Sequence, residues 1–239
     1  MSIQDWEGTA LIIGVGDIGM KMSEILKIIS PNLDVFLCGR NLKNRNQIYL
    51  DLENDVSFSS FEEEISKIKT PLRLVINTSG FLHSKFIKPE KRLSNINRSN
   101  INKNFSVNAI APILLAKSIE KFIKPELPFL FSSISARLGS ISDNTLGGWY
   151  SYRASKAAQN QFLKTLSIEW RRKFPLSIVT ILHPGTCDTK LSKPFQSAVA
   201  KDKLFSPYQA SEYLINIISE QKSSDSGKFI AWDKSFIPW

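Results

Sequence analysis

The chain has 239 residues, of which 42% are hydrophobic and 22% charged, and its formal net charge is +9 at pH 7. This length and composition are typical of one globular domain with a substantial core, and they exclude a disordered or collagen-like chain. The 31 lysines and arginines are scattered along the sequence, which predicts no nucleic-acid partner and instead indicates a basic surface that faces solvent or an anionic ligand.

Apolar runs, most of them continuous, alternate with segments of helical periodicity. Continuous runs are typical of strands that are covered on both faces. The predicted strands are Thr9–Gly14, Leu33–Cys38, Leu72–Asn77, Leu127–Phe131, Leu176–Leu182 and Lys228–Trp232, and the predicted helices are Ile18–Ile29, Phe61–Ile68, Ile101–Phe122, Tyr152–Phe174 and Pro207–Glu220. This order predicts an α/β fold with a Rossmann-type, doubly wound parallel sheet of about seven strands and helices on both faces. Residues 1–239 are expected to form a single domain, with Lys88–Asn104 as a surface loop that leads into a helix.

The first predicted strand runs directly into a glycine-rich loop, GVGDIG, which contributes Gly14, Gly16, Asp17, Ile18 and Gly19 as candidate cofactor-binding residues. Glycines let the backbone turn sharply and approach a pyrophosphate, and the helix that follows offers free N–H groups and a positive dipole end. A strand before the loop and a helix after it are the context that the GxGxxG pattern requires. The loop predicts a dinucleotide-binding site, with a tight glycine turn that holds no ligand as the alternative.

The end of the second predicted strand indicates which dinucleotide binds. NAD-binding sites usually place an acidic residue there, about 20 residues beyond the glycines, whereas this sequence has Cys38, Gly39 and Arg40. The planar, permanently charged guanidinium of Arg40 could pair with a 2′-phosphate. The sequence therefore favours NADP, with NAD as the alternative cofactor and a solvated loop arginine as the alternative interpretation. Asp17 counts against the site, because a carboxylate repels nearby phosphates.

Tyr152 and Lys156 form the sharpest catalytic signal. Because they lie four residues apart on a predicted helix, their side chains share one face. An isolated tyrosine has a pKa near 10, and a nearby positive charge favours the phenolate. The pair predicts Tyr152 as the proton donor to a carbonyl during reduction, with Lys156 lowering its pKa. Tyr150 has no lysine four residues later, so it is not an equivalent candidate.

Further motifs follow in order along the chain. They are Asp51-Leu52, Asn77-Thr78-Ser79-Gly80, Asn108 within Val107-Asn108-Ala109, Ser132-Ser133, Tyr152 with Lys156, and His183-Pro184-Gly185 followed by Thr189. With the glycine loop, these motifs make the chain resemble the short-chain dehydrogenase/reductases over essentially its whole length. The stretch Ser135–Lys156, the segment Leu191–Phe195 and the tail AWDKSFIPW are similar to the C-factor subgroup, which is itself similar to the sniffer-type carbonyl reductases.

The resemblance implies a role for each matching position. Asp51 and Leu52 would bracket the adenine of the cofactor, and Thr189 would hydrogen-bond the nicotinamide amide. Asn108 would anchor a water-mediated proton relay through Lys156. The remaining cofactor-binding residues that the resemblance implies are Asn77, Gly80, Pro184 and Gly185, together with Tyr152 and Lys156 themselves.

The resemblance also implies a serine that polarises the substrate carbonyl by donating a hydrogen bond to its oxygen. The family's usual spacing points to a position that Gly139 occupies here. Ser133 is preferred because it follows the predicted strand Leu127–Phe131, and Ser140 is the alternative on spacing. The glycine loop is one residue shorter than the family's usual TGxxxGxG, and Ile13 replaces the threonine.

These motifs together predict an NAD(P)(H)-dependent oxidoreductase that interconverts a carbonyl and an alcohol by hydride transfer. The alternative is a cofactor-binding signalling or sensor protein of the C-factor type with incidental activity, but the complete set of Asn108, Tyr152 and Lys156 argues against it. A nucleotide-sugar epimerase of the extended relatives shares the glycine loop and YxxxK. Such enzymes carry a C-terminal substrate domain, and too little chain follows Thr189 to form one.

The segment Leu191–Tyr208 is where this architecture usually places its substrate lid. Its Phe195 and Phe205 predict a partly apolar small-molecule substrate, and Trp149 is a further candidate for lining the pocket. The two long predicted helices Ile101–Phe122 and Tyr152–Phe174 resemble the dimer-forming pair of the family, which implies a homodimer or homotetramer.

The cysteines and histidines predict no metal site, because Cys38 and Cys187 lack a metal-ligand spacing and His83 and His183 lie in different motifs. Cys38 lies in an apolar run and is expected to be a buried thiol, which indicates a reduced, cytoplasmic setting. No apolar stretch approaches the roughly 20 residues that span a bilayer, so no membrane association is predicted. The acidic N-terminal segment also argues against a signal peptide.

Overall fold

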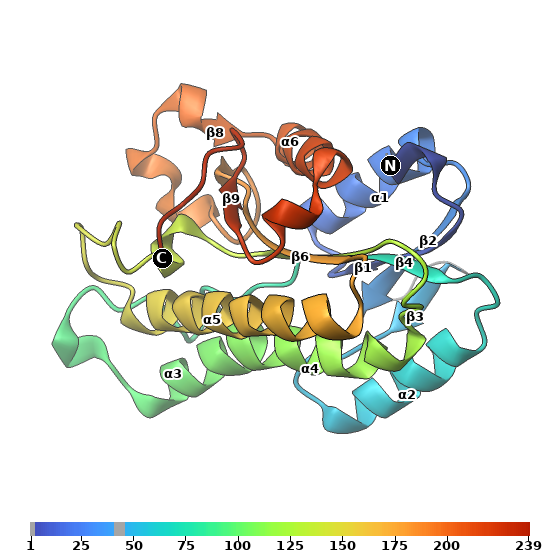
Figure 1. Ribbon diagram of the computed structural model, residues 1–239. Coiled ribbons are helices and arrows are strands. Elements are labelled where there is room, and N and C mark those ends of the chain that lie inside the picture. The colour runs from blue at the N-terminus through green and yellow to red at the C-terminus, as the bar shows by residue number, and fades with distance from the viewer. Residues whose placement is uncertain (1–2, 41–45) are drawn as a thin grey trace.

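Parallel strands form the central sheet, and its middle strands are buried along their whole length because helices cover both faces. The computed structural model describes residues 3–40 and 46–239, and within these residues the sheet has seven strands in the order β3-β2-β1-β4-β5-β6-β9 (Figure 1). The strands are β1 Gly8–Ile13, β2 Leu33–Gly39, β3 Gln47–Tyr49, β4 Leu72–Asn77, β5 Phe129–Ile134, β6 Ser177–His183 and β9 Phe229–Ala231, with a separate short pair, β7 Thr186–Cys187 and β8 Leu204–Phe205.

The helices divide between the two faces of the sheet, as Figure 1 shows. The side chains of Ala10 and Ile12 in β1 pack with helices on one face, whereas Leu11 and Ile13 pack with helices on the other. One face is covered by α1 Asp17–Ile29 and α6 Pro207–Glu220, and the other by α2 Asp55–Ser66, α4 Ala111–Ile119 and α5 Tyr150–Lys173, with α3 Arg98–Phe105 preceding α4. The predicted α/β, doubly wound parallel fold is confirmed.

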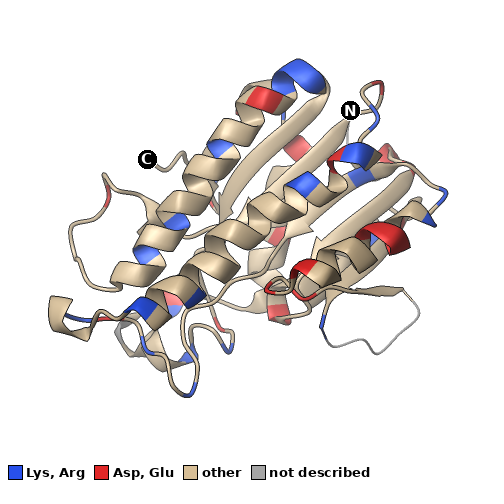
Figure 2. Cartoon of the chain, turned by 90° about the horizontal axis from the view of Figure 1, so that it is seen from below, with Lys and Arg blue, Asp and Glu red and all other residues tan. Residues whose placement is uncertain are grey.

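Figure 2 views the molecule from the side of α2, α4 and α5, which lie next to one another across the sheet. On this side the lysines and arginines are spread along the helices and the loops, with acidic residues among them. Among the described residues, no helix combines the length and the apolarity that crossing a membrane requires.

Several predicted element boundaries differ from the structure, and in two cases a local hydrogen bond explains the difference. The strand predicted to end at Phe131 continues to Ile134, because Ser132 is satisfied inside the sheet by a 2.9 Å hydrogen bond to Thr180. Helix α2 begins at Asp55 and not at Phe61, since the side chain of Asn54 caps it by accepting from the Val56 N–H at 3.0 Å. Strand β3 was not predicted.

The helix predicted for Ile101–Phe122 is interrupted. It starts earlier, at Arg98, where Asn97 caps it by accepting from the Asn100 N–H at 2.9 Å, so the predicted loop Lys88–Asn104 ends sooner than expected. Residues Ser106–Ile110 then form a π-helical turn before α4. Pro112 has no N–H to donate to the Asn108 carbonyl, which removes an α-helical hydrogen bond at this turn.

Candidate active site

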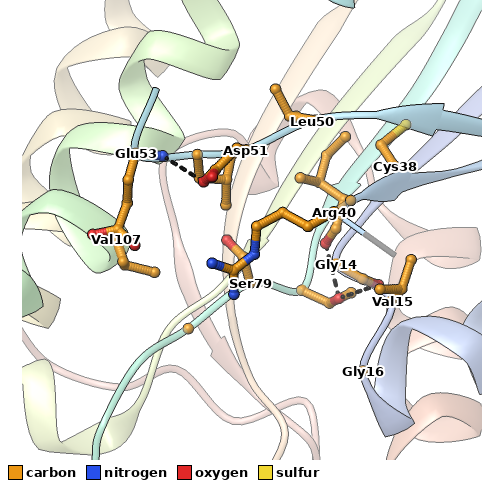
Figure 3. A pocket seen from close by; sticks show the side chains of 15 residues that line it. Gly14, Val15, Gly16, Cys38, Arg40, Leu50, Asp51, Glu53, Ser79 and Val107 are labelled. Atoms are coloured by element: carbon orange, nitrogen blue, oxygen red, sulfur yellow. Dashed lines mark hydrogen bonds between the residues drawn. The ribbon is translucent and has the colours of Figure 1, made fainter. Parts of the chain in front are cut away.

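A cavity of about 370 Å³ opens at the carboxyl ends of β1, β2 and β4. The order of the strands reverses between β1 and β4, and open α/β sheets bind their ligands at such a switch point. Its lining residues are Ile13, Gly14, Val15, Gly16, Cys38, Gly39, Arg40, Leu50, Asp51, Leu52, Glu53, Thr78, Ser79, Gly80 and Val107 (Figure 3). Six of the predicted cofactor-binding residues are therefore together in one cavity: Gly14, Gly16, Arg40, Asp51, Leu52 and Gly80.

The glycine loop is shaped by close packing against Thr78. Gly14 has a φ of 108°, and a Cβ there would lie 2.6 Å from the Thr78 hydroxyl oxygen, which donates to the Ile13 carbonyl at 2.9 Å. A Cβ on Gly19 would lie 2.0 Å from the Gly14 carbonyl oxygen. Gly16 differs, since a Cβ there would meet nothing within 4 Å and the residue lines the cavity. Gly14 and Gly19 therefore maintain the shape of the loop, and Gly16 leaves room for a ligand.

The start of α1 suits an anionic ligand. Its N-cap residue is Gly16, which has no side chain to bond the first N–H groups of the helix. These N–H groups and the positive end of the helix dipole lie beside the cavity, so the loop fits the pyrophosphate of a dinucleotide.

Asp17 and Ile18 are not among the lining residues. The Asp17 carboxylate instead accepts from the Lys190 N–H at 3.4 Å, which links the glycine loop to the segment after β7. Ile18 is half-buried against the apolar cluster of α1 and α6. The prediction that Asp17 and Ile18 bind the cofactor therefore stays a prediction.

Figure 3 shows the Arg40 side chain extending from the end of β2 across the cavity, toward Ser79. Two acidic residues lie in the same cavity, where Asp51 accepts from the Glu53 N–H at 3.1 Å. The Glu53 carboxylate is paired with Lys103 at 2.5 Å, so part of its charge is balanced. Arg40 is thus an exposed cation directed into the cavity.

Tyr152 and Lys156 are both buried on α5, with 7% and 2% of their surface exposed. The Lys156 ammonium donates to the Ile134 carbonyl at 3.0 Å and to Gln159 Oε1 at 2.8 Å. Within the described part of the chain, the Tyr152 hydroxyl has no hydrogen-bond partner. The Tyr152 hydroxyl is therefore free to bond a ligand, although most of the side chain is buried.

Burial dominates the pKa values of this pair. It lowers the pKa of Lys156 to about 7, because the charged amine loses hydration. It also raises the pKa of Tyr152 above its ordinary value. Burial is the cause of the raised pKa of Tyr152, and the lowering of this pKa by Lys156 stays a prediction.

Asn108 lies in the π-helical turn, and its side chain binds the peptide groups of Phe81. Its Oδ1 accepts from the Phe81 N–H at 2.7 Å, and its Nδ2 donates to the Phe81 carbonyl at 2.8 Å and to Ser155 Oγ at 3.0 Å. Both Asn108 Oδ1 and Lys156 Nζ would lie within 4 Å of a Cβ on Gly80, which lines the cavity. The structure therefore brings the predicted relay residues Asn108 and Lys156 to the inner edge of the cavity.

The hydroxyls of the two candidate serines both form hydrogen bonds within the protein. Ser133 is fully buried, and its hydroxyl oxygen accepts from Asn77 Nδ2 at 2.9 Å and from Gln159 Nε2 at 2.8 Å. Gln159 is seven positions from Tyr152, which corresponds to about 10 Å along α5. Ser140 donates to the Pro238 carbonyl at 2.5 Å. Among the described residues neither hydroxyl is hydrogen-bonded to Tyr152, and Ser133 is instead linked to Lys156 through Gln159.

Asn77, Pro184, Gly185 and Thr189, which were also predicted to bind the cofactor, are not among the residues that line the cavity. Asn77 is buried and accepts from the Ser79 hydroxyl at 2.6 Å, so it holds a lining residue in place. After β6, Pro184 is buried and Gly185 has a φ of 75°. The half-buried Thr189 has its N–H bonded to the Cys187 carbonyl at 2.9 Å.

A row of aromatic rings lies beside Tyr152. The Trp149 ring meets Tyr152 edge-on at a centroid distance of 6.2 Å and Phe195 at 4.9 Å. Phe195, in the 3₁₀ segment Lys193–Ala198, also meets His83 at 5.4 Å. The prediction for Phe205 is wrong, because that side chain is buried against Tyr213 and Trp232 in a separate cluster.

Sequence reasoning missed several residues that build this site. Thr78, Ser79 and Gln159 contribute hydrogen bonds. Thr78 and Ser79 lie inside the motif Asn77–Gly80, but no role was predicted for either, and the only sequence signal for Gln159 was its position near Lys156. Glu90 is 2% exposed and bonds to Ser151. It lies in the segment predicted as a surface loop, so nothing in the local pattern pointed to it.

Comparison with known proteins agrees with this geometry. The family model described as short chain dehydrogenase matches residues 9–200. The chain is 26% identical over 148 residues to the C-signal protein of Myxococcus xanthus, which is 62% of this chain and 83% of that protein. It is 32% identical over 143 residues to a 1-hydroxy-2-glutathionyl-2-methyl-3-butene dehydrogenase of Rhodococcus sp. (strain AD45), a match that spans 58% of each chain.

Two solved structures share the fold over nearly the whole chain. The carbonyl reductase Sniffer of D. melanogaster has a TM-score of 0.84 at 21% identity and covers 98% of this chain and 100% of its own. An NADPH-bound carbonyl reductase from chicken fatty liver has the same TM-score and identity, with 98% and 99% covered. At this identity, the likeness establishes the fold and leaves the chemistry to the residues of the site.

Proposed function

Because the chain belongs to the short-chain dehydrogenase family of oxidoreductases, we propose that it interconverts a carbonyl and an alcohol with NADP(H), with Tyr152 as the proton donor and acceptor. The observation that carries this proposal is the hydroxyl of the largely buried Tyr152 side chain, which has no hydrogen-bond partner among the described residues and lies one helical turn from Lys156. The cavity that would hold the cofactor adjoins Lys156 at Gly80.

Arg40 and the glycine loop support NADP as the cofactor. The N–H groups at the start of α1 would hold the pyrophosphate, with Gly16 leaving the space for it. The Arg40 guanidinium would bind the 2′-phosphate as a bidentate donor. Asp51 and Leu52 would contact the adenine end, and Thr189 the nicotinamide end.

A bound nicotinamide supplies or accepts the hydride. During reduction, Tyr152 Oη donates its proton to the substrate oxygen as the carbonyl carbon gains the hydride, and in oxidation it takes the proton back. The Lys156 amine, whose pKa burial lowers to about 7, can exchange a proton near neutral pH. Asn108, beside the same Gly80, would connect this amine to solvent through water.

Ser133 is given a supporting role in this proposal. Its hydroxyl holds the Gln159 amide at 2.8 Å, and Gln159 in turn accepts from Lys156 at 2.8 Å. Ser133 therefore orients the lysine through Gln159, and polarisation of the substrate carbonyl falls to Tyr152.

The rings of Trp149, Phe195 and His83 favour a substrate with an aromatic or other flat apolar group beside its carbonyl. Two buried, free thiols, Cys38 and Cys187, fit a reducing compartment, and the proposal places the protein in the cytoplasm. Self-association into a homodimer or homotetramer is part of the proposal by family likeness.

The similarity to the C-signal protein supports a second candidate function, that of a cofactor-binding signalling protein with incidental activity. Tyr152 and Lys156 argue against it, since a binding protein has no need of a proton donor with a buried amine beside it.

The test is a steady-state assay of the purified protein with NADPH or NADH. The substrates are acetophenone and 2-octanone, two methyl ketones with the same number of carbon atoms. We expect turnover with NADPH, faster with the aromatic ketone. Turnover with neither ketone, despite NADPH binding, would support the signalling alternative. A preference for 2-octanone would contradict the proposed preference for an aromatic substrate and leave the proposed reaction unaffected.

A further inference from the structure

Glu90 is a buried carboxylate at the start of the catalytic helix, and neither the proposed reaction nor the cofactor uses it. Only 2% of its surface is exposed, although it lies in the irregular segment between β4 and α3. Its Oε2 accepts from the Ser151 N–H at 3.1 Å, and its Oε1 accepts from the Ser151 hydroxyl. Its backbone carbonyl accepts from the Trp149 N–H at 2.5 Å. One residue thus receives three hydrogen bonds from the entry to α5.

The entry to α5 lacks a cap of its own. The N-cap residue is Trp149, whose side chain cannot accept a hydrogen bond from the first N–H groups. Its backbone is in the left-handed conformation, with φ 52° and ψ 43°, which is unfavourable for a residue with a Cβ. Glu90 supplies the missing acceptor from a distant part of the chain, and its negative charge lies at the positive end of the helix dipole.

The burial of this charge is balanced by these hydrogen bonds. Among the described residues, Glu90 takes part in no ion pair. The nearby Arg153 guanidinium bonds instead to the carbonyls of Gly147 and Gly148, in the turn before the helix. Burying a carboxylate costs free energy unless hydrogen-bond donors surround it. Glu90 and Ser151 therefore have to keep their positions relative to each other.

The two residues held by Glu90 are neighbours of Tyr152. Ser151 directly precedes Tyr152, and the Trp149 ring contacts both Tyr152 and Phe195. Displacing a reacting group by about 1 Å can cost about a hundredfold in rate. The first turn of α5 therefore has to be fixed for Tyr152 to donate its proton efficiently.

We propose that Glu90 is a positioning residue. Its carboxylate holds Ser151 and its backbone carbonyl holds Trp149, and together these contacts form a clamp that sets the Tyr152 hydroxyl and the Trp149 ring against the substrate. This inference rests on the proposed function. The clamp is separate from the glycine loop, so its loss lowers kcat and leaves NADPH affinity unchanged.

The test compares Glu90→Gln and Ser151→Ala with the wild type. The glutamine keeps the buried volume but has one acceptor oxygen in place of two, and Ser151→Ala removes the hydroxyl donor and keeps the Glu90 charge. Glu63→Gln, the same change at an exposed carboxylate of α2, is the matched control. The measurements are kcat and KM for acetophenone, the Kd of NADPH, and hydrogen–deuterium exchange of residues 149–156.

We expect kcat to fall by about tenfold or more in Glu90→Gln and by less in Ser151→Ala, with the Kd of NADPH unchanged and faster exchange at the start of α5. Glu63→Gln should match the wild type in every measurement. Wild-type kcat in both clamp variants overturns the proposal, and so does a parallel loss of NADPH affinity, which would indicate general destabilisation.

The proposed function can fail separately. If the wild type reduces no ketone, the proposed function fails, and with it the role of Glu90 in proton donation. The exchange data then still test whether Glu90 fixes the start of α5, and unchanged exchange of residues 149–156 in Glu90→Gln would overturn that role.

Discussion

Arg40 is the residue on which cofactor choice depends. Its guanidinium extends across the cavity from the end of β2, where an acidic residue would favour NAD. A hydrogen bond to a charged group contributes about 1.5–3 kcal/mol, so Arg40→Ala should raise the Kd of NADPH by about 10- to 100-fold. The Kd of NADH should not change, because NADH has no 2′-phosphate. Titrations that follow cofactor fluorescence check this, and equal weakening of both cofactors would mean that Arg40 has another role.

Lys156 makes the unfolding free energy depend on pH. Burial lowers its pKa to about 7, whereas the pKa of a lysine in an unfolded chain is about 10.4. Between these values the unfolded state binds a proton that the folded state does not. The folded state is therefore favoured more strongly as the pH rises from 7 toward 10, and this advantage is lost as the pH falls back to 7.

Replacing Lys156 with methionine removes this pH dependence. The stability advantage of Lys156→Met over the wild type should shrink between pH 7 and pH 9, by at most about 1.4 kcal/mol for each pH unit. Urea unfolding of both proteins at each pH gives the difference directly. An advantage that stays constant over this range would show that the buried amine keeps its proton.

At the scale of elements, different glycines of the loop before α1 contribute to stability and to cofactor binding. A Cβ on Gly19 would lie 2.0 Å from the Gly14 carbonyl oxygen, whereas a Cβ on Gly16 would enter open space. Gly19→Ala should therefore lower the unfolding free energy by about 1–3 kcal/mol. Gly16→Ala should keep the wild-type stability and raise the Kd of NADPH by about tenfold, which corresponds to about 1.4 kcal/mol of binding free energy.

Thermal unfolding and NADPH titration of the two glycine variants make the comparison. If Gly16→Ala binds NADPH as well as the wild type does, the ligand does not approach the loop at this residue. If Gly19→Ala is as stable as the wild type, the loop relaxes more easily than the close contact indicates.

The elements also show where sequence reasoning reached its limit. Continuous apolar runs predicted the central strands and periodicity predicted most helices, because burial on the sheet leaves a regular pattern. Ser132 and Ser133 were placed outside β5, since two serines look like a strand end unless their buried partners, Thr180 and Gln159, are known. The early starts of α2 and α3 depend on single asparagine caps.

For the whole molecule, the sheet order and the position of the cavity follow from the β-α-β-α pattern and the glycine loop. Tyr152, Lys156 and Asn108 were recognised because their spacing and order are specific. Glu90 was not, since its role depends on contacts between segments that are far apart in the sequence. That residues 1–239 form one domain stays a prediction.

The central claim for the whole molecule is that Tyr152 moves the proton in a reaction for which the rest of the fold holds NADP. The most direct test is Tyr152→Phe, assayed for NADPH-dependent reduction of acetophenone and for NADPH affinity on the same preparation. We predict that kcat falls by about 10²- to 10⁴-fold, the contribution of a general acid, while the Kd of NADPH stays at the wild-type value. Wild-type turnover in the phenylalanine variant would contradict the account.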